Sequence, residues 1–311
     1  MKKIFALLLC LVLVFSVTAT FVAVEGGEEQ YPQESFSVVE KNLITGEETI
    51  ETTVNANLEE ILDEYSSHNQ QPNFRSEIIA PYQIIGNNDM ELIEDTTEWP
   101  YSAVAFIKVY WPNAETTRGT ASLISSNVAV TAAHNLYNAE LDMWATSVTV
   151  YPGMSDSDLI GSLLNGYQSS VLAASIDWVE RGDINYDWGT IVLDEEVDES
   201  DIGFYFVIDF FPTNPPTNMP ITVLGYPNTG SLVTNYSQHM SNGVITDVSP
   251  NIFLHNADTL EGSSGSPILS QRADIIGINV GRSSPENGNI GVKMDTNAIV
   301  NIFNIVSRYR P

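Results

Sequence analysis

The sequence predicts an all-β fold, and three observations lead to that prediction. Short runs rich in β-branched and aromatic residues recur from residue 101 onward. Turn-forming residues separate them, as at Pro112-Asn113 and Pro152-Gly153. No pattern repeats with a period of about 20 to 50 residues, which argues against propellers and solenoids. Many short strands at this spacing are typical of β-barrels or a β-sandwich. Examples of the predicted strands are residues 104–110, 120–124, 128–131, 147–151, 190–193, 221–224, 268–269 and 275–280.

The C-terminal segment departs from the strand pattern. Either Asp295 or Thr296 can cap a helix there, and Arg308 and Arg310 lie near its end. A helix is therefore predicted over about residues 295–308. Its apolar positions, which recur at helical spacing and predict a face packed in the core, are Ile299, Ile302, Phe303 and Val306.

The N-terminus has the form of a removable signal peptide. Met1-Lys2-Lys3 precedes an apolar run that ends near Val17, and small residues follow near Ala19. Residues 1–23 are thus predicted to be a signal peptide, and the protein to be secreted and extracellular. Cys10, the chain's one cysteine, lies in that run after Leu9, which does not suit a lipoprotein signal. The mature protein then has no disulfide, and no Cys/His spacing indicates a metal site.

The net negative charge of the chain limits the classes of molecule that it can bind. The formal net charge is −28, from 40 acidic and 12 basic residues. Such a surface disfavours nucleic acid and anionic membranes, so we expect neither to be a stable partner once the signal is removed. A solvated acidic face is the simplest interpretation, and adaptation to a salty or alkaline exterior is a weaker one.

Residues 24–83 are acidic and weakly hydrophobic, which indicates a segment that does not build its own core. We expect an acidic propeptide there, with one helix around residues 57–65. Candidate cleavage points lie after Arg75, or just before Gln83 or Ile84. The alternative is an acidic arm that stays attached.

Three segments carry the chemistry. Ser264 is flanked by glycines in Gly262-Ser263-Ser264-Gly265-Ser266-Pro267, His134 ends Thr131-Ala132-Ala133-His134, and Asp187 lies between them in the sequence. A serine oxygen becomes a useful nucleophile when an imidazole takes its proton and a carboxylate holds that imidazole. The order His, Asp, Ser differs from that of subtilisins and α/β-hydrolases.

These blocks, together with Asn185-Tyr186-Asp187-Trp188-Gly189 and Gly225-Tyr226-Pro227, resemble those of the bacterial glutamyl endopeptidases, a branch of the trypsin-like serine proteases. Ile84-Ile85-Gly86-Asn87-Asn88-Asp89 resembles the start of their mature chains, and the likeness runs from about residue 83 to the C-terminus.

The resemblance implies a chymotrypsin-like protease domain over residues 84–311. It would consist of two six-stranded Greek-key β-barrels, about residues 96–200 and 201–293, with the C-terminal helix packed on the second. His134 and Asp187 would come from the first barrel and Ser264 from the second, with the cleft between them. The implied roles are a triad of His134, Asp187 and Ser264, and an oxyanion hole made by the N–H groups of Gly262 and Ser264. No cofactor is needed.

Specificity stays open at this point. The resemblance places Asp258, Thr259, Asn279 and Gly281 around the substrate pocket, with the edge of residues 279–281 available to an extended peptide. Thr259 matches the glutamyl enzymes, but Asn279 stands where they have a histidine, and an asparagine cannot become cationic. Asp258 stands where trypsin binds Lys or Arg. A free α-amine near residue 83 or 84 would favour acidic substrates. Because these signals point in different directions, preferences for Glu/Asp and for Lys/Arg and a broad specificity all remain open.

Two other classes also remain. One is a catalytically silent secreted binding protein on a protease fold, and the other is an esterase using the same acyl chemistry. We expect protein or peptide substrates and a monomer. His239 and His255 lie outside the motifs and are expected to be surface or loop residues.

Overall fold

The computed structural model describes residues 35–54, 89–155, 166–209, 214–229, 236–284 and 288–311. The predicted signal peptide, the expected helix at residues 57–65 and all three candidate cleavage points lie outside these residues. Among the described residues, no helix is both long and apolar enough to cross a bilayer. Residues 1–34 and 35–311 form two separate units, and the fold described below belongs to the second.

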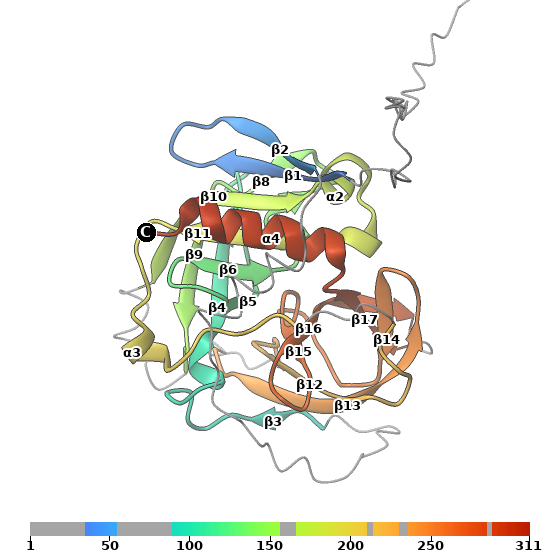
Figure 1. Ribbon diagram of the computed structural model, residues 1–311. Coiled ribbons are helices and arrows are strands. Elements are labelled where there is room, and N and C mark those ends of the chain that lie inside the picture. Colours follow the sequence, from blue (N-terminus) through green and yellow to red (C-terminus); the bar gives the residue numbers. More distant parts are fainter. Residues whose placement is uncertain (1–34, 55–88, 156–165, 210–213, 230–235, 285–287) are drawn as a thin grey trace, which may run out of the picture. The chain divides into compact units, whose positions relative to one another are not determined.

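The first barrel is a closed antiparallel sheet in the order β11-β6-β5-β4-β9-β10, with β10 pairing back to β11 (Figure 1). Its strands are β4 (Val104–Tyr110), β5 (Thr116–Leu123), β6 (Val128–Thr131), β9 (Ser147–Pro152), β10 (Tyr167–Ser175) and β11 (Gly189–Leu193). The strand β4 is buried at Val104–Ile107 and again at Val109, so residues of both its faces are covered.

The second barrel closes in the order β12-β15-β16-β17-β14-β13, with β12 pairing to β13. These strands are β12 (Pro220–Gly225), β13 (His239–Val248), β14 (Ile252–His255), β15 (Pro267–Leu269), β16 (Ile275–Ser284) and β17 (Gly288–Lys293). The prediction of a chymotrypsin-like fold with two six-stranded barrels and a C-terminal helix is confirmed.

Shorter elements join and extend the barrels. The strand β3 (Glu91–Leu92) pairs with β13, and β7 (Tyr137–Asn138) pairs with β8 (Met143–Trp144). Two short helices are α2 (Ile176–Arg181) and α3 (Glu199–Ile202). The 3-10 turns that bear on the site are η2 (Ala133–Asn135) and η5 (Ile184–Tyr186), and η1 spans Tyr101–Ala103.

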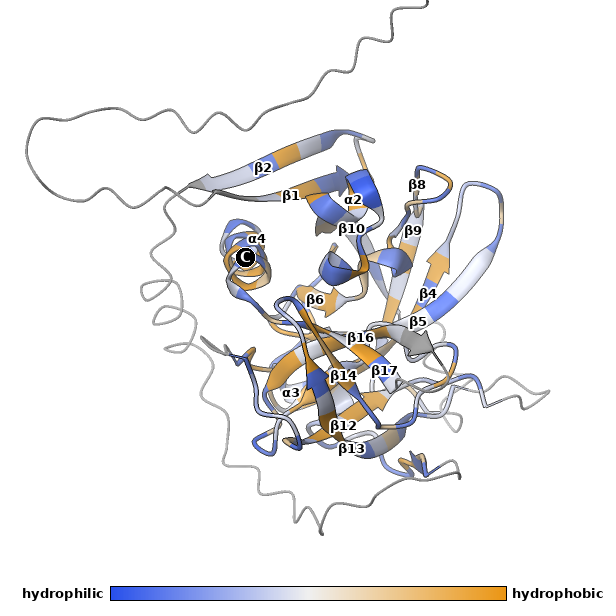
Figure 2. Cartoon of the chain, turned by 90° about the vertical axis from the view of Figure 1, so that its right-hand side faces the viewer, coloured by the Kyte–Doolittle hydropathy of each residue, from blue (hydrophilic) through white to orange (hydrophobic). Residues whose placement is uncertain are grey.

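The helix α4 (Thr296–Tyr309) is capped by Asp295, whose carboxylate accepts the N–H of Ala298 at 2.9 Å. Its apolar face is buried in the core, as the spacing predicts; Figure 2 shows hydrophobic residues along this helix and along the barrel strands. The expectation that it packs on the second barrel is wrong for its C-terminal half. There Asn127 of the first barrel donates to the carbonyl of Tyr309 at 2.5 Å.

A hairpin that the sequence did not reveal adds two strands to the first barrel. It consists of β1 (Ser35–Asn42) and β2 (Glu48–Val54), and β1 pairs antiparallel with β10. It lies inside the segment expected to be a propeptide without a core of its own. Val38 and Val39 are nevertheless buried, so this part of the segment shares the core of the first barrel.

Candidate active site

His134 and Asp187 make two contacts with each other. His134 lies in η2, directly after β6 has brought the chain across the first barrel. Its Nδ1 lies 2.6 Å from Asp187 Oδ2, and its backbone N–H donates to Oδ1 at 2.8 Å. The Asp187 side chain is 2% exposed, whereas that of His134 is 30% exposed. One ring edge is therefore fixed by a buried carboxylate while the ring still reaches solvent.

The segment that carries Asp187 is fastened to β10. Asp187 lies between η5 and β11, beside the fully buried Trp188. The hydroxyl of Ser175, the last residue of β10, donates to the carbonyl of Tyr186 at 2.6 Å and accepts the N–H of Trp178 at 3.1 Å. This anchor fixes the backbone on the N-terminal side of Asp187.

Asp187 changes the basicity of His134. Burial alone lowers the pKa of the imidazole, because it disfavours the charged form. The charge of Asp187 and its hydrogen bond to Nδ1 outweigh burial, so the pKa of His134 lies above its usual value. The imidazole is thus poised to accept a proton.

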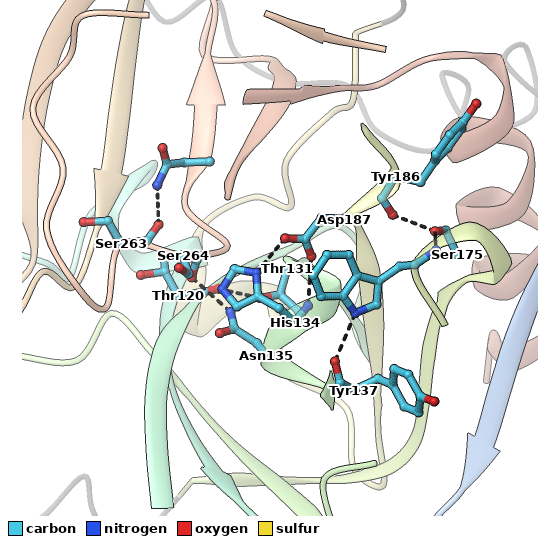
Figure 3. A network of polar contacts seen from close by, with 12 residues as sticks. Thr120, Thr131, His134, Asn135, Tyr137, Ser175, Tyr186, Asp187, Ser263 and Ser264 are labelled. Carbon is cyan, nitrogen blue, oxygen red and sulfur yellow. Dashed lines mark hydrogen bonds and ion pairs between the residues drawn. The ribbon is translucent and has the colours of Figure 1, made fainter. Parts of the chain in front are cut away.

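Ser264 is in a tight loop between β14 and β15. Both flanking glycines have positive φ, +91° at Gly262 and +87° at Gly265, a conformation that costs little only for glycine. A Cβ at position 265 would lie 2.0 Å from the carbonyl oxygen of Thr120. Figure 3 shows Ser264 beside the imidazole of His134, on the side away from Asp187.

The loop that carries Ser264 is held by residues of the first barrel that the sequence did not reveal. Thr120 on β5 donates its backbone N–H to the carbonyl of Ser264 at 2.9 Å and its hydroxyl to the carbonyl of Gly262 at 2.9 Å. Asn135 Nδ2, next to the histidine, donates to the same Ser264 carbonyl at 3.0 Å (Figure 3). No local pattern marks Thr120, because its partner lies 142 residues away.

Two backbone donors point to the chemistry of this loop. Among the residues that the structure describes, neither the N–H of Gly262 nor that of Ser264 has a hydrogen-bond acceptor. In contrast, the N–H of Ser263 donates to Leu260 and that of Gly265 to Asn279. Two such donors, one of them on the serine itself, can stabilise a negative oxygen.

The residues expected around the pocket lie in two segments of the second barrel, 258–259 after β14 and 279–281 in β16. Asp258 and Thr259 are half-buried in the segment after β14. The carboxylate of Asp258 accepts the backbone N–H of Asp89 at 2.8 Å, while its own N–H donates to Ser241. Asp258 therefore fastens the segment that leads into β3.

Asn279 and His255 form a buried pair. Asn279 is 1% exposed; its Nδ2 donates to the carbonyl of Ser263 at 3.0 Å, and its Oδ1 lies 3.3 Å from His255 Nε2. The expectation that His255 is a surface or loop residue is wrong, because it ends β14 and is fully buried. Burial lowers its pKa to about 4, so it is neutral near pH 7. His239, half-buried, is the first residue of β13 and is therefore in a strand, not a loop.

The strand after Asn279 has an open edge. β15 pairs with β16 only as far as Ile278, and a bulge between Asn279 and Gly281 interrupts the pairing with β17. A Cβ at Gly281 would meet nothing within 4 Å. This edge has room for another extended chain.

Among the described residues, no cluster of three or more His, Cys, Asp or Glu side chains has the arrangement of a metal site.

Comparison with known proteins identifies relatives of this chain in sequence and in structure. A curated "Extracellular metalloprotease" of Bacillus subtilis (strain 168) is 28% identical over 230 residues, which cover 72% of this chain and 70% of that protein. A "Glutamyl endopeptidase" of Bacillus licheniformis is 28% identical over 196 residues, 62% of this chain and 57% of that protein's length. The first name refers to a metal-dependent protease and the second to a residue preference, so the names do not decide the chemistry of this chain.

A solved Glu endopeptidase superposes with a TM-score of 0.63 at 25% identity, covering 73% of this chain and 100% of that one. The sequence model of the trypsin-like peptidase domain matches residues 119–278, a little over half of the chain. The matched span contains His134, Asp187 and Ser264. The chain belongs to the trypsin-like peptidase family.

Proposed function

We propose that the protein is a secreted serine endopeptidase with Ser264 as nucleophile, His134 as general base and Asp187 as the group that orients the base. The observation that carries this proposal is the contact of 2.6 Å between His134 Nδ1 and Asp187 Oδ2, with Ser264 on the other side of the ring. A buried carboxylate at Nδ1 keeps Nε2 free to accept a proton.

The steps follow from these positions. Ser264 Oγ attacks the peptide carbonyl as its proton passes to His134 Nε2, and His134 then gives that proton to the leaving amine. A water molecule then attacks the acyl carbon in the same way and gives its proton to His134, which returns a proton to Ser264 as the acyl group leaves. The negative oxygen that forms accepts from the N–H groups of Gly262 and Ser264, a contribution worth about 3 kcal/mol per donor in such sites.

The proposed maturation removes a signal peptide, residues 1–23, and cuts the chain near residue 83 to give a protease domain of residues 84–311. Two contacts support a start near this point. Asp89 donates to Asp258, and β3 pairs with β13, so the first described residues of the mature chain are fastened to the second barrel.

For specificity we propose a preference for Glu or Asp before the cleaved bond. One carboxylate oxygen of Asp258 accepts the N–H of Asp89, which argues against Asp258 serving as the counter-charge for a Lys or Arg side chain of the substrate. The α-amine of a chain beginning at residue 83 or 84 would supply a positive charge for an acidic side chain of the substrate.

A second candidate is broad specificity, and Asn279 favours it. Its amide is already engaged by Ser263 and His255, and it carries no charge. Replacing Asn279 by histidine offers a titratable donor and is expected to raise kcat/KM for Glu substrates about tenfold, the worth of one charged hydrogen bond. Asn279→Gln is the matched control. A broad wild-type profile in a peptide library would reject the acidic preference.

The test of the activity uses secreted protein. Mass spectrometry locates the mature N-terminus, a mixed peptide library reports cleavage, and a fluorophosphonate labels the nucleophile. We expect a start near residue 83, cleavage by wild type, and neither cleavage nor labelling in Ser264→Ala. Processed protein that neither cleaves nor labels would be the silent binding protein, and cleavage of small esters without peptides would be the esterase.

A further inference from the structure

The β1–β2 hairpin completes an edge of the first barrel. Of the nine residues of β10, β9 pairs only with Tyr167 and Gln168. β1 takes up the edge where β9 leaves it, pairing along residues 171–175, and the N–H of Leu43 donates to the carbonyl of Ser170 at 2.9 Å. Without the hairpin, this stretch of backbone would be an unpaired strand edge.

The same hairpin covers apolar surface. Val38 is 1% exposed and Val39 is 6% exposed, and both belong to the main core cluster. Removing the hairpin would therefore expose core as well as backbone, and both losses oppose release.

Charges connect the hairpin to helix α4. Glu40 is 4% exposed, forms an ion pair with Arg308 and accepts from the hydroxyl of Tyr309 at 3.0 Å. Arg308 also lies 3.4 Å from Glu51 on β2. Burying a carboxylate costs free energy unless the carboxylate is paired. The contact of Glu40 with α4 is therefore a specific ion pair and not a nonspecific attraction between charges.

The hairpin lies away from the proposed reaction site. Figures 1 and 2 both show it beside α4 and β10, on the side of the first barrel opposite the second barrel. In β10 it nevertheless reaches Ser175, the residue that anchors the backbone before Asp187, because Val38 pairs with Ser175. A bound hairpin leaves the nucleophile accessible and supports the strand that holds Asp187.

We propose that the hairpin, residues 35–54, remains bound as a second chain of the mature peptidase after a cut between residues 55 and 88. The inference rests on the proposed maturation: one hydrolysed peptide bond ends the covalent connection, while the pairing with β10 and the ion pair with α4 persist. The occupant of this barrel edge is therefore the protein's own N-terminal fragment.

The test uses the full chain carrying Ser264→Ala, with the recognition sequence of a site-specific protease inserted after Arg75. The folded protein is cut, passed over a size-exclusion column at neutral pH and weighed by native and denaturing mass spectrometry. We expect both fragments in one complex that separates only in denaturant, with slow amide exchange at residues 171–175. Fragments that separate on the column, or rapid exchange at those amides, would overturn the inference.

Matched variants test whether the ion pair of Glu40 with α4 holds the hairpin in place. Glu40→Ala is expected to raise the dissociation rate of the cut fragment at least tenfold, whereas Glu47→Ala, which removes an exposed carboxylate from the same hairpin, should change it less than twofold. Equal rates would reject the role of Glu40, and circular dichroism before the cut checks folding. Because no readout uses catalysis, an inactive wild type would count against the proposed function and not against the bound hairpin.

Discussion

Replacing Asp187 by asparagine is expected to remove most of the activity while the fold persists. The carboxylate contacts one residue twice: Oδ1 accepts the backbone N–H of His134 at 2.8 Å, and Oδ2 lies 2.6 Å from Nδ1. An asparagine has one acceptor oxygen and one NH₂ group. Since a backbone N–H only donates, the oxygen has to stay with it, and the NH₂ group then faces Nδ1.

The magnitude follows from the tautomer. An NH₂ group opposite Nδ1 makes that nitrogen an acceptor, so the proton of the neutral imidazole moves to Nε2. Nε2 is the atom that has to receive the proton of Ser264. A wrong tautomer of this kind lowers kcat about 10⁴-fold. This factor corresponds to about 5.5 kcal/mol in the activation barrier, at 1.36 kcal/mol per tenfold.

The assay is kcat/KM on a fluorogenic peptide, with the thermal unfolding midpoint measured beside it. Asp183→Asn is the matched control, because Asp183 caps the same loop by accepting the N–H of Asn185, and asparagine keeps that acceptor. We expect less than a threefold change there. If Asp187→Asn lost less than tenfold at an unchanged midpoint, the argument from the tautomer would be refuted.

Three further outcomes are expected. The acid limb of kcat/KM should have its midpoint above pH 6.5, because His134 has to be neutral to accept a proton and its pKa is raised; a midpoint below pH 6 in a pH profile would contradict this. Gly265→Ala should unfold at much lower urea than Gly46→Ala, because a Cβ at 265 meets backbone at 2.0 Å, whereas Gly46, also with positive φ, has nothing within 4 Å; the latter should cost about 1–2 kcal/mol, and equal losses would reject the clash. Thr120→Val keeps the shape but loses the hydroxyl, and should lower stability by about 1–3 kcal/mol for each buried backbone group left unpaired; wild-type stability and kcat would show that the hydroxyl is not needed.

Local motifs account for what the sequence predicted well. The strands follow from short apolar runs between turns, and the α4 helix follows from its spacing and its cap at Asp295. His134 and Asp187 were expected as partners from the order of three short motifs and from their resemblance to the glutamyl endopeptidases, and the structure brings the two side chains together. The strands and the helix depend on residues that are close together in the sequence, so a local pattern predicts them.

The hairpin could not be predicted on the same basis. Its core residues Val38 and Val39 are adjacent, so they give no alternating pattern, and its acidic residues resemble a solvated arm. The buried carboxylate of Glu40 has its partners in Arg308 and Tyr309, which lie 268 and 269 residues away. Pairing at such a distance leaves no local signal.

Asn279 illustrates a similar limit within the pocket. Read alone, it is a replacement of an expected histidine. In the fold it has a histidine as its neighbour, because His255 from β14 lies against it. That contact, together with the bond from Nδ2 to the carbonyl of Ser263, holds the buried asparagine side chain between β14 and the loop of Ser264.

Thr120 shows how the two barrels jointly define the site. Its hydroxyl donates to the carbonyl of Gly262 and accepts the N–H of Tyr226, two segments of the second barrel, while its own carbonyl accepts the hydroxyl of Thr131 just before the histidine. One residue of β5 is therefore in contact with both the loop that carries Ser264 and the strand that leads to His134. A shift of one barrel against the other would strain the bonds of Thr120 to Gly262 and Tyr226, because both cross between the barrels and hydrogen bonds are directional. The distance between Ser264 and the imidazole thus depends on a residue that takes no part in the proton transfer.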